Sequence, residues 1–414
     1  MQRGLAGTSG AYLIGALLLV AAVEQQPVLA LIAFLLLVLM ILTIVWRRKC
    51  LTNVEYHRFF TPDRAFVGET IDFRTEIVNR KILPLPWLEL DEEIPESMHI
   101  VAGGKAGISS IPLRAAVHNL LSMQWYERVV RNYKVLCTER GYHTFGPAVL
   151  HSGDIFGFFS DHAEVPKLDY VLVYPEVVPL QELGLPTKQP FGSRKAQLRI
   201  LDDPMRIAGI REYTTGDSLK RVHWKATART QQLQVKLLEP SADLDLLLFL
   251  NVTTFVPDWQ GNIPVLLEEA IVVAASLADH AFKQGYKVGL YVNTNVPGSD
   301  QESKLASARD PDQMMRILET LAKVAGFATV SMDIFMQQQS VNLPWGATVV
   351  LVTAVAPDPM LAALYRLKRA GHKVATVLVG DHEISPSTMA GLNVFIAKRN
   401  PGKQTQDRGD LALV

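Results

Sequence analysis

Residues Leu244–Val252 read LDLLLFLNV, a run in which Asp245 is the only charged residue. A continuous apolar run of this kind is typical of a β-strand that is buried on both faces of a parallel sheet. Further segments alternate along the chain: helices are predicted over 265–283, 310–324 and 359–370, and strands over 287–292, 348–353 and 373–379. This alternation predicts a doubly wound α/β domain over residues 242–414.

Glycine and proline mark the ends of the predicted helices. Gly285 and Gly371 follow two of them, where a left-handed residue commonly ends a helix. Asp310 precedes Pro311, which predicts an N-cap with proline at the first helical position. The polar residues 400–410 are expected to form a disordered tail.

The carboxyl ends of the parallel strands are where domains of this class bind their ligands. Neither a GxGxxG nor a GxxxxGK[ST] sequence occurs in residues 242–414. A dinucleotide site and a P-loop nucleotide site are therefore unsupported, and we expect no cofactor.

Residues 51–182 show the pattern of a β-sandwich. The segment Thr70–Val78, TIDFRTEIV, alternates apolar and polar residues as a half-buried strand does, and residues 126–139 form a second such stretch. Short strands separated by turn residues predict an antiparallel sandwich. The turn Gly153–Phe159, GDIFGFF, is interpreted as aromatic side chains that fill one end of the sandwich, with a ligand site as the alternative.

Residues 1–50 predict a transmembrane helical hairpin. Two apolar runs, about 4–23 and 27–46, are each long enough to cross a bilayer as a helix. Basic residues flank the hairpin at Arg3 and at Arg47–Lys49, so the positive-inside rule directs both ends and the soluble domains to the cytoplasm. The alternative is a signal peptide with a cleavage site near Ala21-Ala22, in which case the second run would stop translocation.

The charge balance argues against nucleic-acid binding, and the cysteine content argues against a zinc site built from cysteines. The 41 Lys and Arg residues are balanced by 41 Asp and Glu residues, so no overall field attracts nucleic acid, and we expect none as a partner. Cys50 and Cys137 are the two cysteines, and no zinc motif accompanies them. This usage fits a reducing compartment.

The segment Arg211–Arg229 reads REYTTGDSLKRVHWKATAR and lies in a predicted linker over 183–241. Neither a helical nor a strand period explains its mixture of polar and aromatic residues. It is therefore either a structural clasp or a binding surface. The candidate residues are Arg211, Glu212, Tyr213, Gly216, Asp217, Arg221, His223, Trp224, Lys225 and Arg229.

The order of these motifs resembles the bacterial membrane proteins grouped as domain of unknown function 58. The resemblance rests on the two apolar spans, RG followed by FGP, GDIFGFF, VYPEV and the segment Arg211–Arg229. It implies a multi-pass protein of the bacterial cytoplasmic membrane with a von Willebrand factor A-like C-terminal domain. It also implies a MoxR-type AAA+ ATPase and other membrane proteins as partners. The activity of the family is unassigned.

A von Willebrand A domain often carries a metal-ion-dependent adhesion site, with the motif Asp-x-Ser-x-Ser, a Thr and a further Asp around Mg²⁺. The matching residues here are Asn251, Thr253 and Phe255, and Thr353 is followed by Ala354. Because the carboxylates that attract the cation are missing, we expect no metal at this degenerate site.

Two non-catalytic interpretations of the segment Arg211–Arg229 compete. As a clasp between the two domains, Asp217 would cap a helix beginning near Ser218, and Trp224 would pack beneath arginines paired with Glu212 or Glu239. As a binding surface, the segment would present Trp, Tyr and Arg, the residue types that dominate interface energetics. An AAA+ ATPase is the partner that the resemblance implies.

The third interpretation is enzymatic. His223 would act as general acid or base, oriented by Asp217 or Glu212, while Arg211 and Arg221 would hold an anionic group. No nucleophile or metal cluster accompanies these residues in the sequence.

The sequence thus favours an α+β multidomain protein with a transmembrane hairpin, a β-sandwich and a von Willebrand A-like domain. We expect a non-enzymatic adaptor or assembly factor that acts with a MoxR-type ATPase in envelope or membrane-complex biogenesis. The alternative is a hydrolase or phosphate-ligand enzyme that uses His223.

Overall fold

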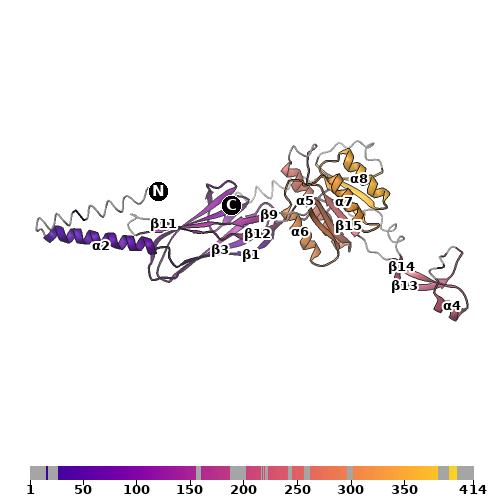
Figure 1. Cartoon of the computed structure of the whole chain (residues 1–414), viewed down its shortest axis with the longest axis horizontal. Helices are drawn as coiled ribbons and strands as arrows, with labels where there is room; N and C mark the ends of the chain where they lie inside the picture. Colours follow the sequence, from indigo (N-terminus) through magenta and orange to yellow (C-terminus); the bar gives the residue numbers. More distant parts are fainter. Residues whose placement is uncertain are drawn as a thin grey trace. The chain divides into compact units, whose positions relative to one another are not determined.

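The computed structural model describes residues 15–16, 27–154, 160–186, 202–215, 217, 219, 222–240, 245–255, 262–295, 302–380 and 391–398. Two compact units, Met1–Tyr174 and Pro175–Val414, make up the chain (Figure 1). The boundary falls before residue 182, the predicted end of the sandwich. The reason is that Val178 N–H donates to Ser276 Oγ (3.0 Å) and Lys398 N–H donates to the Leu183 carbonyl (3.2 Å), which ties this segment to the second unit.

Helix α2, Pro27–Lys49, is the one helix among the described residues with the length and apolar composition of a membrane span, over Pro27–Trp46. Many of its apolar side chains between Val28 and Val45 are exposed, although Ala33 is buried. At its carboxyl end, Trp46 packs with Cys50 and Leu51 against the sandwich core. Apart from residues 15–16, the predicted first span lies outside the described residues, so the hairpin stays a prediction.

The first unit contains three sheets, in the strand orders β1-β3-β8-β5, β11-β10-β4-β7-β6 and β2-β12-β9. Strands β3 and β8 correspond to the two long alternating stretches of the sequence. The strand bounds are β1 Val54–Thr61, β2 Arg64–Phe66, β3 Thr70–Asn79, β4 Leu85–Pro95, β5 Met98–Ala102, β6 Ala106–Ile108, β7 Arg114–Met123, β8 Arg128–Cys137, β9 Gly141–Phe145, β10 Ala148–Gly153, β11 Ser160–Val165 and β12 Asp169–Tyr174.

The four-stranded and five-stranded sheets face each other across an apolar core. Phe73 of β3 and Val135 of β8 share one buried cluster with Ile94 of β4 and Val117 of β7. Side chains from two sheets that interdigitate in this way define a β-sandwich, as the sequence predicts. Of the turn GDIFGFF, residues 155–159 lie outside the described part of the chain.

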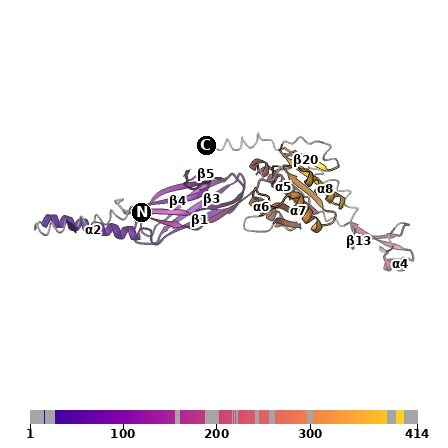
Figure 2. The same cartoon turned by 45° about the horizontal axis from the view of Figure 1, so that its top comes forward.

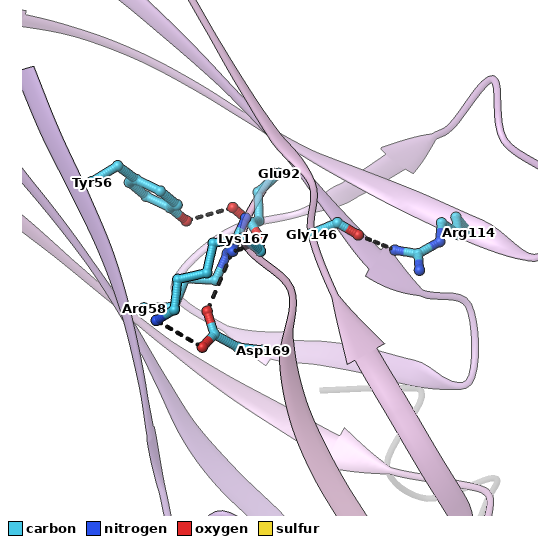
Figure 3. A network of polar contacts seen from close by, with 7 residues as sticks. All are labelled: Tyr56, Arg58, Glu92, Arg114, Gly146, Lys167 and Asp169. Carbon is cyan, nitrogen blue, oxygen red and sulfur yellow. Dashed lines mark hydrogen bonds and ion pairs between the residues drawn. The ribbon is translucent and has the colours of Figure 1, made fainter. Parts of the chain in front are cut away.

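A buried polar network crosses all three sheets of the sandwich (Figure 3). The Arg58 Nε atom on β1 donates to Glu92 Oε1 on β4 at 2.6 Å, and both side chains are 1% exposed. The Tyr56 hydroxyl donates to the other Glu92 oxygen. Arg58 Nη1 donates to the Lys167 carbonyl at 2.5 Å and lies 3.3 Å from Asp169 Oδ2 on β12. This network stabilises one arrangement of the three sheets.

Burial controls the ionisation of this network. Removal from water raises the pKa of Glu92 to about 7, against the opposing attraction of Arg58. For Arg58, burial acts to lower the pKa, but Glu92 and Tyr56 more than offset it, so the pKa is raised. The guanidinium therefore remains charged inside the sandwich.

Gly146, in the FGP motif of the sequence, lies against the same network. Its φ is +91°, and a Cβ built on it would lie 2.7 Å from Arg58 Nη2 and 2.9 Å from the Lys167 carbonyl. Its own carbonyl accepts a hydrogen bond from Arg114 Nη1 at 2.6 Å (Figure 3). Only glycine leaves room for this packing. The FGP motif therefore has a structural role.

The second unit contains a six-stranded sheet in the order β17-β16-β15-β18-β19-β20. Figure 2 labels its strand β20 together with the helices α5, α6, α7 and α8. All neighbouring strands are parallel except β17, which runs antiparallel to β16 at one edge. The strand bounds are β15 Asp245–Leu250, β16 Lys287–Asn295, β17 Glu302–Ala308, β18 Thr348–Thr353, β19 Lys373–Val379 and β20 Asn393–Ala397. The helix bounds are α5 Pro264–Lys283, α6 Gln313–Lys323, α7 Met332–Gln339, η3 Ser340–Asn342 and α8 Asp358–Arg369.

Strand β15, which contains most of the run LDLLLFLNV, is buried on both faces. Leu247 and Phe249 belong to a core cluster with Phe335 of α7 and Leu364 of α8. Alternate residues of a strand point to opposite faces, so Leu248 points to the other face, where helix α5 contacts β15, β16, β18 and β19. The predicted doubly wound α/β architecture is therefore present.

The helix ends are partly as expected. Gly285 and Gly371 adopt φ values of +85° and +96° after α5 and α8, which confirms both caps. The predicted start of the next helix at Asp310 is wrong, because α6 begins at Gln313 with Asp312 as N-cap. Strands β17 and β20 and helix α7 were not predicted. Residues 400–410 lie outside the described part of the chain.

Candidate functional site

The segment predicted as a linker contains an ordered antiparallel hairpin. Strand β13, Asp202–Glu212, pairs with β14, Gln234–Pro240, and the short helix α4, Trp224–Thr230, lies between them in the chain. Val222 and Val235 form an isolated β-bridge and are both buried. We name residues 209–236 the motif arm, because they contain the segment Arg211–Arg229.

An ion pair organises the turn of the motif arm. Arg211 Nη1 and Nη2 contact Asp217 Oδ2 and Oδ1 at 2.7 and 2.6 Å, a bidentate geometry. The Thr214 N–H and hydroxyl both donate to Asp217 Oδ2 at 2.9 Å. Arg211, followed by the Thr214 donors, holds the pKa of Asp217 well below its usual value. The predicted residues Gly216 and Arg221 lie outside the described part of the chain.

Helix α4 has a histidine cap. It starts at Trp224, and His223 is the N-cap residue, whose Nδ1 accepts from the Ala226 N–H at 3.0 Å. The helix predicted to begin near Ser218 falls on residues that lie mostly outside the described part of the chain, and the described contacts of Asp217 are with Arg211 and Thr214. Thr227 Oγ1 accepts from the Gln234 N–H at 3.0 Å, which attaches α4 to β14. A helix of seven residues depends on such contacts because it is not stable alone.

The apolar side chains of the motif arm are turned to solvent. Trp224 is 69% exposed and Leu219 is 66% exposed, and Ile210 and Leu233 are also exposed. The expectation that Trp224 packs beneath arginines is therefore wrong in this structure. The α4 helix has no buried residue, so its outer face is free of intramolecular packing among the described residues.

The remaining predicted residues of the arm have modest roles. Tyr213 is half-buried and its N–H donates to the Leu233 carbonyl at 2.9 Å. Glu212 contributes its carbonyl, rather than its carboxylate, to Arg211. Lys225 and Arg229 are exposed on α4 and have no ion-pair partner within the described part of the chain.

The His223 geometry differs from the one required by the enzymatic interpretation. That interpretation requires Asp217 or Glu212 to orient the ring. Both Asp217 oxygens bind Arg211, and no described carboxylate contacts the His223 ring. The Nδ1 atom accepts a backbone hydrogen bond, which commits this side of the imidazole to capping.

The second candidate lies at the carboxyl ends of the parallel strands, where the degenerate metal positions are. Asn251 follows β15 and Thr353 ends β18, the two strands between which the strand order reverses. Asn251 Nδ2 donates to Thr353 Oγ1 at 3.0 Å, and Asn293 Nδ2 on β16 donates to Asn251 Oδ1 at 3.0 Å. The Thr253 N–H donates to the same oxygen at 3.2 Å. We name Asn251, Thr253, Asn293 and Thr353 the edge network.

Backbone groups fix the orientation of the edge network. Asn293 Oδ1 accepts from the Val252 N–H at 2.9 Å, and its Nδ2 also donates to the Val330 carbonyl at 3.1 Å. The Thr353 hydroxyl donates to the Val355 carbonyl at 2.6 Å. All four network residues are buried, whereas Phe255 lies at the surface and supplies no polar atom. The network is thus uncharged and internally hydrogen-bonded, an arrangement unlike the oxygen ligand set of a Mg²⁺ site.

A hollow of about 290 Å³ adjoins Thr253 and is otherwise lined by residues 326–331. Its described lining contains no ionisable side chain. Asn293 was not predicted as a site residue. Its signal in the sequence is the segment Asn293-Thr294-Asn295, which places polar residues at the carboxyl end of an apolar strand.

Sequence comparison finds a family match over part of the chain. Residues 209–386 match the family described as "Protein of unknown function DUF58". The match begins in β13 and extends beyond β19, so the motif arm and most of the six-stranded sheet fall within one family region.

The chain is also similar to the "Uncharacterized protein YeaD" of Bacillus subtilis (strain 168). The identity is 26% over 249 residues, which is 58% of this chain and 56% of that protein. The match therefore spans little more than half the length of this curated relative.

Solved structures resemble only part of the chain. A cohesin module from Clostridium perfringens covers 29% of this chain and 95% of its own, with 10% identity and a TM-score of 0.21. The CARDB domain of a Pyrococcus furiosus protein, in complex with di-metal ions, covers 29% of this chain and 90% of its own, with 13% identity and a TM-score of 0.18. Similarities at this level carry no functional argument.

Proposed function

We propose that this chain is a membrane-anchored protein that binds a protein partner through the motif arm and performs no chemistry itself. The observation that carries the proposal is the exposed Trp224, held on a short helix whose position is fixed by polar contacts. Trp and Arg are the residue types that most often anchor protein interfaces. The arm combines both with neighbouring exposed apolar side chains.

The anchor is helix α2. A helix that exposes apolar side chains along most of its length, here from Val28 to Val45, is unfavourable in water and favourable in lipid. The basic cluster Arg47–Lys49 follows the apolar run and supports a cytoplasmic position for the soluble units. A second span over residues 4–23 completes the proposed hairpin.

The order of the motif arm supports recognition without large rearrangement. The Arg211–Asp217 pair and the His223 cap hold the turn and α4 before any partner binds. A preorganised surface loses less conformational entropy on binding than a disordered segment does. The arm is therefore suited to specific docking.

A MoxR-type AAA+ ATPase is the proposed partner, by resemblance to the domain of unknown function 58 family. The proposed process is the assembly of envelope or membrane complexes, with other membrane proteins as further partners. The six-stranded domain is proposed to be von Willebrand A-like, which its 3-2-1-4-5-6 type of strand order supports. Its uncharged edge network supports a role that does not require a metal.

The test is affinity capture of the full-length tagged chain from detergent-solubilised membranes, with quantification of the co-purified MoxR-type ATPase. Trp224→Ala should reduce the captured ATPase at least tenfold, because loss of an interface anchor costs about 2 kcal/mol or more. Trp345→Ala is the matched control, since Trp345 is 64% exposed and lies outside the arm.

Capture that is equal for the wild type and Trp224→Ala would contradict the docking role of the arm. A wild-type chain that captures no ATPase would contradict the proposed partner. Both variants should keep the far-ultraviolet circular dichroism of the wild type, because neither side chain is buried.

A further inference from the structure

The outward face of the five-stranded sheet carries a cluster of imidazole and carboxylate side chains. Glu89 and Asp91 lie on the same face of the central strand β4. Across β4 and β7, Asp91 pairs with His118, and across β4 and β10, Glu89 pairs with His151. We name Glu89, Asp91, His118 and His151 the outer-sheet cluster.

The donor atoms of the outer-sheet cluster lie close to the spacing that a metal ion needs. His118 Nδ1 is 2.6 Å from Asp91 Oδ1, and His151 Nε2 is 3.4 Å from Asp91 Oδ2. One ligand atom from each of Glu89, Asp91 and His118 lies within 4.8 Å of the other two. Ligands at about 2.0–2.1 Å from a tetrahedral Zn²⁺ are about 3.3 Å apart. The group of Glu89, Asp91 and His118 is wider than this, and His151 adjoins it through Asp91, so side-chain rotations are needed to complete the coordination.

The charge balance of the cluster is also suited to a cation. Neither Glu89 nor Asp91 ion-pairs with a lysine or arginine among the described residues, and Asp91 contacts only histidines. Elsewhere on the sandwich, Glu76 pairs with Arg74 and Arg128. The two carboxylates of β4 thus share one face without a permanent positive charge to offset their repulsion.

The backbone holds the cluster in place. Strand β4 is hydrogen-bonded to β7 on one side and to β10 on the other, so the four Cα positions are fixed by the sheet. A rigid scaffold reduces the ordering cost of assembling the ligands. Two imidazoles with two carboxylates favour Zn²⁺, Co²⁺, Ni²⁺ or Cu²⁺, whereas Mg²⁺ and Ca²⁺ prefer oxygen ligands alone.

We propose that the outer-sheet cluster binds one divalent transition-metal cation of the zinc class, ligated by Glu89, Asp91, His118 and His151. The bound cation would join β7, β4 and β10 through their side chains and would neutralise the carboxylates. This site is independent of the motif arm, so the partner-binding proposal can fail without affecting it.

The test is isothermal titration of ZnCl₂ into the full-length chain in detergent, after treatment with EDTA and its removal. The wild type should bind one Zn²⁺ per chain, and MgCl₂ should give no comparable isotherm. Asp91→Asn and His118→Gln, which preserve side-chain size, should each weaken Zn²⁺ binding at least about tenfold. His99→Ala is the control, because His99 is exposed on β5 of the other sheet.

A second readout is the visible absorption of the Co²⁺-loaded chain, whose intensity distinguishes four-coordinate from six-coordinate geometry. Intense d–d bands that disappear in His118→Gln are expected. The proposal is overturned if no one-site isotherm is seen, if Asp91→Asn and His118→Gln bind Zn²⁺ as the wild type does, or if Mg²⁺ binds equally well.

Discussion

Arg58 and Arg211 each bind a carboxylate, but in opposite environments. Arg58 and Glu92 lie inside the sandwich, with side chains that are 1% exposed (Figure 3). Arg211 and Asp217 form a bidentate pair on the surface of the motif arm, where the Arg211 side chain is 43% exposed, whereas Arg58 contacts Glu92 through Nε. The pKa of Glu92 is raised by burial, whereas the pKa of Asp217 is lowered by Arg211 and Thr214. An arginine–carboxylate pair thus has a structural role inside the sandwich, whereas on the motif arm it orders an exposed turn.

The difference in burial between these two ion pairs determines which of them can contribute to stability and which can contribute to binding. A buried pair is costly to desolvate and holds the sheets in register only while both partners are present. An exposed pair contributes little to global stability because water and salt screen it. The exposed pair and its neighbour Trp224 are therefore available for recognition, and the buried pair is not.

The largest expected effect is that of Glu92→Ala. The variant leaves the Arg58 guanidinium buried beside a lost partner, so the free energy of unfolding of the sandwich should fall by about 3–5 kcal/mol. Amide hydrogen exchange of β1 and β4 in the detergent-solubilised full-length chain measures this change. Glu164→Ala on the edge strand β11 is the control and should change it by less than about 0.5 kcal/mol. If Glu92→Ala and Glu164→Ala changed the free energy of unfolding equally, the structural role of the Arg58–Glu92 pair would be contradicted.

The second expected effect is on pH dependence. The pKa of Glu92 is about 7 in the folded chain, compared with an ordinary value of 4.5. Between these values the folded state retains a proton that the unfolded state has released, so the contribution of Glu92 to stability is complete below pH 4.5 and is lost as the pH rises to 7. The loss should be on the order of 3 kcal/mol for β1 and β4, measured by hydrogen exchange corrected for intrinsic rates. Glu92→Gln should lack this slope, and a slope identical to the wild type would contradict the assignment.

The third prediction concerns the edge network. Asn293→Ala leaves the Val252 N–H and the Val330 carbonyl without their partner. An unpaired buried polar group costs about 1–3 kcal/mol, so the opening free energy of β15 and β16 should fall by that amount. Asn342→Ala, at an exposed position after α7, is the matched control. If Asn293→Ala left the opening free energy of β15 and β16 unchanged, the edge network would not stabilise these strands.

The smallest expected effect on stability is that of Arg211→Ala. Because this ion pair is exposed, faster exchange should be confined to residues 211–217, and protection of β3 and β15 should be unchanged. Global destabilisation comparable to that of Glu92→Ala would instead favour the clasp interpretation. Hydrogen exchange on the same preparation distinguishes the two outcomes.

The sequence predicted the sheet domain well because burial leaves a local signature there. The run LDLLLFLNV and the glycines at 285 and 371 gave the central strand β15 and two helix ends. Strand β17 was missed because it lies at a sheet edge, where alternation is weak, and α7 is too short for a clear helical period.

The candidate sites were less predictable because their contacts join distant residues. Asp217 has the composition of a helix cap, but its partner Arg211 lies on the preceding strand. Asn293 belongs to the edge network through a contact with Asn251, 42 positions away in the sequence. His118, His151 and Asp91 meet only because β7, β4 and β10 are neighbours in one sheet. Strand pairing, which local patterns do not encode, decides the last two cases.

The most direct test of the central claim is a hydrogen-exchange footprint of the purified MoxR-type ATPase on the full-length chain. The account predicts slower exchange in residues 209–236 when the ATPase is added to the wild type, and no such slowing with Trp224→Ala. Protection elsewhere in the chain with unchanged exchange in residues 209–236, or slowing that persists in Trp224→Ala, would contradict it.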